Sequence, residues 1–198
     1  MSNNSNNALA TDLTNSIMTS LVDSSVDSQE EYRPRLLVND AKSGIKILSS
    51  LQEELKNCDE FAISVAFINW GGIVNLLDLF KELDKKGVKG RILTTNYLNF
   101  TEPKALKRLN EFENIEVKMF KTNRGSEGFH TKGYIFKKEE VFDIIVGSSN
   151  LTQSAITVNK EWNIRLVSRS KGEYATKVVN EFDQLWDSDK ALEYDDFF

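Results

Sequence analysis

Residues 129–150 read FHTKGYIFKKEEVFDIIVGSSN, and EWNIRLVS follows at residues 161–168. Apolar and β-branched residues form three segments of strand length here, at 129–136, 141–149 and 161–168. The intervals between them leave no room for the helical crossovers that parallel strands need. We therefore expect these segments to pair as antiparallel or meandering strands of one sheet.

Upstream of residue 129, strand patterns and helix patterns alternate. Strand-like runs occupy residues 35–39, 60–67, 89–96 and 114–120. Apolar residues recur with helical spacing in residues 44–58, 71–87 and 102–112, and again near the C-terminus in residues 172–188. Such alternation is typical of parallel pairing. Together with the antiparallel half, it predicts an α/β fold with a mixed sheet flanked by helices.

The N-terminal segment has a different composition. Residues 1–31 contain seven Ser, five Asn, five acidic residues and no Lys or Arg, which is typical of a poorly ordered segment. An apolar residue nevertheless recurs at every fourth position, at Leu9, Leu13, Ile17 and Leu21. We expect a flexible leader over 1–31 with a short amphipathic helix that docks on the body or on a partner. One folded domain should follow over 32–198.

The overall composition excludes several classes of protein. With 198 residues, of which 40% are hydrophobic, the chain can bury a sizeable core. It has a single cysteine, Cys58, so no internal disulfide can form. No apolar run approaches the ~20 residues that span a bilayer, and the first residues lack the pattern of a secretory signal. These features predict a cytoplasmic protein with no membrane partner.

Charge is unevenly distributed along the chain. The net charge is −5, yet residues 85–140 carry 13 Lys and Arg against 7 Asp and Glu, a balance of +6 that leaves −11 elsewhere. A local basic surface for nucleic acid is one interpretation. The alternative is that Lys85, Lys86 and Lys89 end a helix and that Lys137 and Lys138 lie at a solvated hairpin tip.

His130 and Lys132 carry the strongest chemical signal. They lie two residues apart in a strand-like segment, so both side chains should project from one face. His130 is the only histidine of the chain. A neutral imidazole, with an unperturbed pKa of about 6.5, can attack phosphorus and form a phosphohistidine. Lys132 would hold the negatively charged oxygens.

Three further residues complete the predicted site. Ser148 and Asn150 follow Gly147, which lets the backbone approach closely, and both can donate hydrogen bonds to phosphate oxygens. Glu161 is the candidate carboxylate that orients His130, and it alternates with Asn163 and Arg165 on one face of the third segment. This chemistry requires no metal and no cofactor, although composition alone leaves Mg²⁺ bound by carboxylates open.

These motifs resemble those of the phospholipase D superfamily, His-x-Lys followed by Asp five residues later and then Gly-Ser-x-Asn. The expected Asp is replaced by Lys137. The nuclease branch of the superfamily commonly lacks that Asp and uses a downstream acid, here Glu161. The resemblance implies the phospholipase D-like fold, with His130 as the nucleophile, Lys132, Ser148 and Asn150 as phosphate ligands, and Glu161 as the partner of the histidine.

The resemblance also has implications for assembly. Superfamily catalysis uses two histidines, and this chain has one motif, which implies a homodimer with one active site shared across a two-fold axis. Residues 32–186 look most similar to the phospholipase D-like module at the N-terminus of bacterial DEAD/DEAH-box helicases linked to restriction or DNA repair. No Gly-x-x-x-x-Gly-Lys-Ser/Thr loop occurs. A helicase partner, in the same or another polypeptide, is therefore an expectation.

The sequence thus predicts a metal-independent hydrolase, a nuclease that cuts DNA through a phosphohistidine. The first alternative is a catalytically silent DNA-binding module of a helicase. The second is a lipid phosphodiesterase, which we favour less because the chain offers no amphipathic helix rich in Lys, Arg and Trp.

Overall fold

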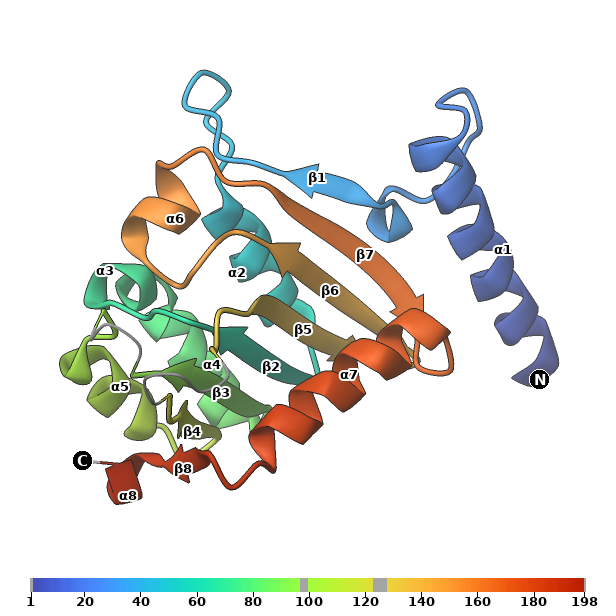
Figure 1. The fold of residues 1–198 in the computed structure, drawn as a ribbon. Coiled ribbons are helices and arrows are strands. Elements are labelled where there is room, and N and C mark those ends of the chain that lie inside the picture. Colours follow the sequence, from blue (N-terminus) through green and yellow to red (C-terminus); the bar gives the residue numbers. More distant parts are fainter. Residues whose placement is uncertain (1, 97–99, 123–127, 198) are drawn as a thin grey trace.

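The computed structural model describes residues 2–96, 100–122 and 128–197 (Figure 1). Within these residues, eight strands form one sheet in the order β1-β7-β6-β5-β2-β3-β4-β8. Its strands are β1 (Arg35–Leu37), β2 (Glu60–Val65), β3 (Lys89–Thr95), β4 (Ile115–Phe120), β5 (Lys132–Lys138), β6 (Val141–Gly147), β7 (Asn163–Arg169) and β8 (Ala191–Glu193).

The predicted mixed sheet is confirmed. Strands β2, β3 and β4 are parallel, and β5, β6 and β7 follow one another as antiparallel neighbours. Strand β5 also pairs with β2 in antiparallel fashion, which joins the two halves at the centre of the sheet. Strand β5 begins at Lys132, three residues later than predicted, so His130 lies in the segment that leads into the strand.

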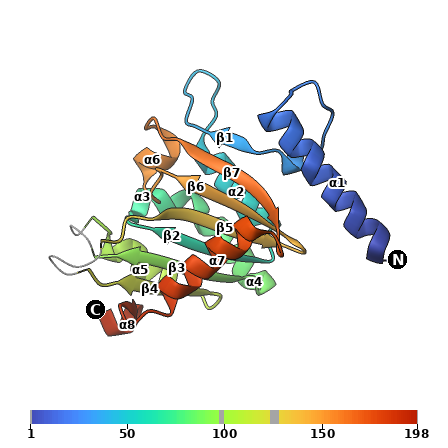
Figure 2. The same ribbon diagram turned by 45° about the vertical axis from the view of Figure 1, so that its right-hand side comes forward.

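Helices cover the two faces of the sheet unequally. One face packs against α2 (Ile47–Asn57), α3 (Trp70–Ile73), α4 (Leu77–Lys86) and α5 (Pro103–Asn110). On the opposite face, α7 (Glu173–Trp186) crosses the sheet diagonally, and much of β6 and β7 stays open on that side (Figures 1 and 2). The short helices α6 (Gln153–Thr157) and α8 (Tyr194–Phe197) follow β6 and β8.

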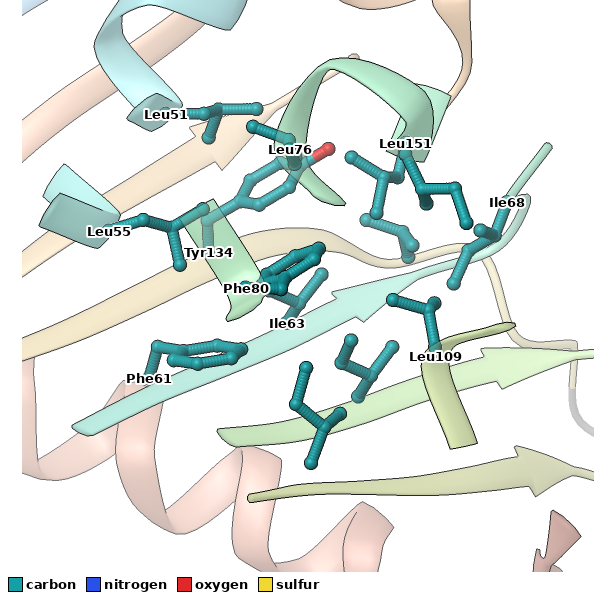
Figure 3. Close-up of a cluster of buried hydrophobic side chains, with 14 of the residues drawn as sticks. Leu51, Leu55, Phe61, Ile63, Ile68, Leu76, Phe80, Leu109, Tyr134 and Leu151 are labelled. Carbon is teal, nitrogen blue, oxygen red and sulfur yellow. The ribbon is translucent and has the colours of Figure 1, made fainter. Parts of the chain in front are cut away.

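The main core lies between the sheet and the four helices of the first face (Figure 3). Leu51 and Leu55 of α2 and Phe80 of α4 meet Ile63 of β2 and Tyr134 of β5, and all five side chains are almost fully buried. Burial of this apolar surface, at about 25 cal/mol per Å², fixes β5 against the helices. The segment that carries His130 therefore adjoins a strand that is fixed by the core.

The helix predicted over residues 71–87 is interrupted. It consists of α3, the 3-10 helix η2 (Val74–Leu76) and α4. A side chain on Gly72 would collide with the carbonyl oxygen of Leu151, and the Asn69 side chain accepts hydrogen bonds from the backbone of Gly72 at 2.8 Å and of Gln153 at 3.2 Å. The first turn is thus shaped by the segment after β6, a constraint that helical periodicity does not reveal.

The leader is helical over most of its length. Helix α1 (Ser2–Leu21) is connected to the 3-10 helix η1 (Glu30–Tyr32) through polar contacts, such as that from Ser16 Oγ to the Gln29 carbonyl at 3.1 Å. Of the predicted apolar stripe, Ile17 and Leu21 remain exposed. That half of the stripe does not pack on the domain.

Four charged side chains form a buried network near the end of the sheet where β5 meets β6 in a hairpin. Glu54 of α2 contacts Arg165 of β7 at 2.6 Å and Lys138 of β5 at 2.7 Å. Asp143 of β6 contacts the same two cations, Lys138 at 3.1 Å and Arg165 more closely still. Arg165 also donates to the carbonyl of Glu31 at 2.7 Å, which ties the leader to the sheet. Burial raises the pKa of Asp143.

The basic window of the sequence is not one surface. Lys85 and Lys86 lie in the last turn of α4, as the structural interpretation predicted, and Gly87 ends the helix in the left-handed conformation. For Lys89 that interpretation was wrong, because Lys89 is the first residue of β3. Lys137 pairs with Glu60 at 3.0 Å, whereas Lys138 is partly buried and pairs with Glu54 at 2.7 Å and Asp143 at 3.1 Å. These cations do not line the predicted site.

Candidate active site

His130 precedes β5 by two residues, in a segment that runs alongside the residues that follow β2. The carbonyl of its neighbour Thr131 accepts a hydrogen bond from Ala66 at 3.1 Å, and the Thr131 hydroxyl contacts that of Ser64 at 2.6 Å. His130 is exposed, and its ring meets the ring of Phe67 nearly edge-on, with centroids 6.1 Å apart. The backbone is therefore held while the imidazole stays open to solvent.

Lys132 places a positive charge directly beside this histidine. Its side chain is only 8% exposed, and Nζ donates to the carbonyl oxygen of His130 at 3.0 Å. Burial lowers the pKa of the ammonium group, and the nearby charge of Glu161 opposes that shift. A cation with so little contact with water interacts strongly with an incoming anion.

Ser148 and Asn150 lie in the loop after β6. A side chain on Gly147 would collide with the carbonyl oxygen of Trp162, which explains the glycine at this position. Ser148 exchanges hydrogen bonds with Trp162, from backbone N–H to carbonyl and from Trp162 N–H to the hydroxyl, both at 3.1 Å. The Asn150 side-chain oxygen accepts from the Phe67 N–H at 3.1 Å.

Phe67 connects the two halves of the site. Its backbone binds Asn150, and its ring contacts His130. Among the residues the structure describes, none accepts a hydrogen bond from the amide nitrogen of Asn150, which leaves two N–H donors for a ligand.

Glu161 lies in the lead-in to β7. One carboxylate oxygen accepts a short hydrogen bond from Ser148 Oγ, and the other lies 3.5 Å from Asn159 Nδ2. Within the described ranges, with their gaps at 97–99 and 123–127, no side chain hydrogen-bonds the ring of His130. The role of Glu161 as the partner of the histidine stays a prediction, and its visible partner is Ser148.

Buried hydrogen bonds to Ser149 hold the loop after β6, and the sequence analysis did not assign them. Asn163 donates to Ser149 Oγ at 2.9 Å and accepts from the Ser149 N–H at 3.2 Å. The Tyr134 hydroxyl donates to the Ser149 carbonyl at 2.9 Å. All three side chains are buried. Asn163 was visible in the sequence only as a polar residue on the same strand face as Glu161.

The arrangement can accommodate a tetrahedral anion. An exposed imidazole, a shielded ammonium group, a hydroxyl and an amide come from the lead-in to β5 and the loop after β6, two neighbouring strands. Fixed donors of this kind stabilise charge on phosphate oxygens during transfer. Lys137, which replaces the superfamily's Asp, points instead to Glu60 near the far end of β5. In the part of the chain that is described, no three His, Cys, Asp or Glu side chains are grouped as metal ligands.

A mixed sheet with this pair of motifs at one end defines the phospholipase D class of phosphodiesterase folds. A family model described as "Cardiolipin synthase, PLD-like domain" matches residues 51–186, well over half of the chain. The protein belongs to this family of phospholipase D-like domains. No curated protein sequence matches it significantly.

Solved structures show the same fold. NucT from Helicobacter pylori superposes with a TM-score of 0.64 at 16% identity and covers 81% of this chain and 98% of its own. Nuc from Salmonella typhimurium, a phospholipase D family member, gives 0.60 at 17% identity, with 82% and 99% covered. Phosphatidylserine synthase from Haemophilus influenzae gives 0.64 at 14% identity, with 82% and 41% covered.

Proposed function

We propose that this protein is a nuclease that cleaves DNA through a phosphohistidine intermediate, without a metal. The observation that carries the proposal is that His130 is exposed, while the buried Lys132 two residues later holds its ammonium group 3.0 Å from the His130 carbonyl oxygen. A neutral ring nitrogen can reach a phosphodiester there while the cation holds its non-bridging oxygens. The amide group of Asn150 supplies further N–H donors to the same oxygens, and the Ser148 hydroxyl can join them only by turning its O–H away from Glu161.

The reaction has two steps. In the first, a nitrogen of His130 forms a bond to phosphorus, the bond to the leaving oxygen breaks, and that oxygen takes a proton from a general acid. In the second, water attacks phosphorus and the N–P bond breaks. The proton of the water goes to the group that acted as the acid. The chain has no second histidine for this role, which favours the His130 of a second copy.

An exposed apolar face supports such a dimer. Leu36, Ile164 and Val146 lie side by side across β1, β7 and β6, and all three are exposed, Leu36 at 62%. Trp162, 73% exposed, precedes Ile164 on the same face and is hydrogen-bonded to Ser148. Contiguous exposed apolar surface of this kind marks interaction sites. We propose that a second copy covers it and brings the two histidines to one site.

Ile164→Glu tests the dimer. A buried carboxylate at the centre of this surface has no partner, so we expect a monomer by sedimentation and a loss of cleavage of at least about 100-fold. Ile17→Glu is the matched control, because Ile17 is equally exposed but lies on α1. A monomeric wild type, or a dimer that Ile164→Glu leaves intact, would contradict the proposal.

Cleavage in EDTA tests the chemistry. We expect labelled DNA to be cut in the absence of free divalent metal, and acid-labile phosphate to be trapped on His130 in quenched reactions, because nitrogen attacks phosphorus directly. Mass spectrometry of the intact chain checks the adduct. Cleavage that appears only when Mg²⁺ is restored would contradict the metal-independent scheme.

We also propose that the domain acts with a helicase in a restriction or repair system in the cytoplasm. Support comes from the sequence similarity over residues 32–186 and from motif spacing. Among the described residues, no helix is long and apolar enough to cross a membrane.

A further inference from the structure

The rings of His130, Phe67 and Phe100 lie in a row on one side of the candidate site. The Phe67 ring meets His130 at 6.1 Å and Phe100 at 5.1 Å between centroids, nearly edge-on in both contacts. Phe67 is half-buried, whereas Phe100 is 59% exposed. A large apolar ring held in water next to a phosphate site is a surface that a ligand can cover.

Contacts on either side of Phe67 and after Phe100 hold these rings in place. Thr101, the neighbour of Phe100, is buried, and its hydroxyl contacts the carbonyl of Ala66 at 3.3 Å and that of Thr95 at 3.2 Å. The Glu102 N–H donates to the Ile68 carbonyl at 2.8 Å. The segment that carries Phe100 is thus fastened to the end of β2, which lowers the entropy lost when a ligand stacks on the ring.

A second aromatic group lies nearby, beside a cation. Lys104, in the first turn of α5, holds its ammonium group 4.0 Å from the centroid of the Trp70 ring. The backbone of Trp70 donates to the Glu102 carboxylate at 2.8 Å, in the segment between Phe100 and α5. Trp70 is partly exposed, and a positive charge beside accessible aromatic surface suits single-stranded nucleic acid.

We infer that Phe100, supported by Phe67, stacks against an unpaired nucleobase next to the phosphate held at His130, so that single-stranded nucleic acid is the preferred substrate. The inference rests on the proposed function. Every base has a π-face that can stack on an aromatic ring. In a duplex these faces are covered by neighbouring base pairs, so only an unpaired base can use the platform.

We test this inference by measuring the binding of three labelled DNA probes, each 12 nucleotides long, by fluorescence anisotropy. The probes are a single strand, the matching duplex and a single strand of abasic deoxyribose phosphates. Phe100→Ala should weaken binding of the single strand about 5- to 100-fold and leave the other two unchanged. Phe100→Trp should bind the single strand at least as well as wild type, and Phe100→Leu should behave like Phe100→Ala because it keeps apolar area without a π-face.

Leu21→Ala, which removes a similarly exposed apolar side chain from α1, is the matched control and should leave the affinity for all three probes unchanged. Equal binding of all three probes by wild type and Phe100→Ala would overturn the inference. So would an equal loss on all three probes, or a Phe100→Ala protein that is monomeric where wild type is dimeric. The selective loss on single strands supports the inference even if the protein never cuts, so its failure and that of the nuclease proposal are distinguishable.

Discussion

His130→Ala is expected to reduce DNA cleavage by at least about 10³-fold, the scale seen when a nucleophile that works with fixed partners is removed. The substitution should slow the cleavage step without changing protein stability or DNA binding. The ring is exposed, and among the residues that the structure describes its ring contact is with Phe67, so the melting temperature should stay that of wild type. Lys132 and Asn150 remain, so binding of uncleaved DNA should persist. Single-turnover cleavage and anisotropy measure the two quantities.

Mixing wild-type and His130→Ala subunits tests whether the active site is shared between two copies. If each site needs two copies of His130, a heterodimer of wild type and His130→Ala has no complete site. Equal amounts of re-equilibrated subunits should then retain about a quarter of the activity of the wild type at the same total concentration. About half would show that each chain works alone.

Two outcomes would direct attention to the alternatives. A wild type that binds DNA and never cuts it, with no adduct on His130, would identify a silent DNA-binding module. Turnover of phospholipid vesicles without cleavage of DNA would identify a lipid phosphodiesterase. Either result contradicts the nuclease proposal while leaving the fold unchanged.

Arg165→Leu is expected to lower the free energy of unfolding by about 3–5 kcal/mol, because removing one partner from a buried ionic network leaves uncompensated charge. Arg165 is buried together with Glu54 and Asp143, so both carboxylates lose a close partner when the guanidinium is removed. Lys138 would be left to balance two carboxylates. The loss of its bond to the Glu31 carbonyl should also loosen the leader. Urea denaturation measures the change through the transition midpoint.

A surface pair and a double variant serve as controls. Lys177→Ala removes one partner of an exposed pair with Glu173 on α7 and should change stability by no more than about 0.5 kcal/mol. The double variant Glu54→Leu/Arg165→Leu should recover part of the loss, because a carboxylate leaves with the guanidinium. If Arg165→Leu proves no more harmful than Lys177→Ala, the network is not a stabilising unit.

Local periodicity sufficed for much of the fold. The alternation of strand and helix patterns before residue 129 and the closely spaced strands after it determine a mixed sheet, because side-chain spacing reports which face an element buries. Motif spacing likewise identified His130, Lys132, Ser148, Asn150 and Glu161 as candidates. The two-residue spacing of His130 and Lys132 was interpreted as strand alternation, but β5 begins only at Lys132, so the position of His130 depends on how the lead-in segment is held.

Only the tertiary structure revealed what surrounds those residues. Asn163 bonds to Ser149, and Glu161 accepts a hydrogen bond from Ser148. Arg165, expected beside the site by strand alternation, instead contacts Glu54 of α2 and Asp143 of β6. The Phe67–Phe100 contact likewise joins the end of β2 to the segment that precedes α5. Each of these contacts joins separate elements of the chain, and local pattern carries no information about them. Sequence patterns therefore predicted most of the elements and a set of candidate side chains, whereas the order of the strands in the sheet decided which partners those side chains meet.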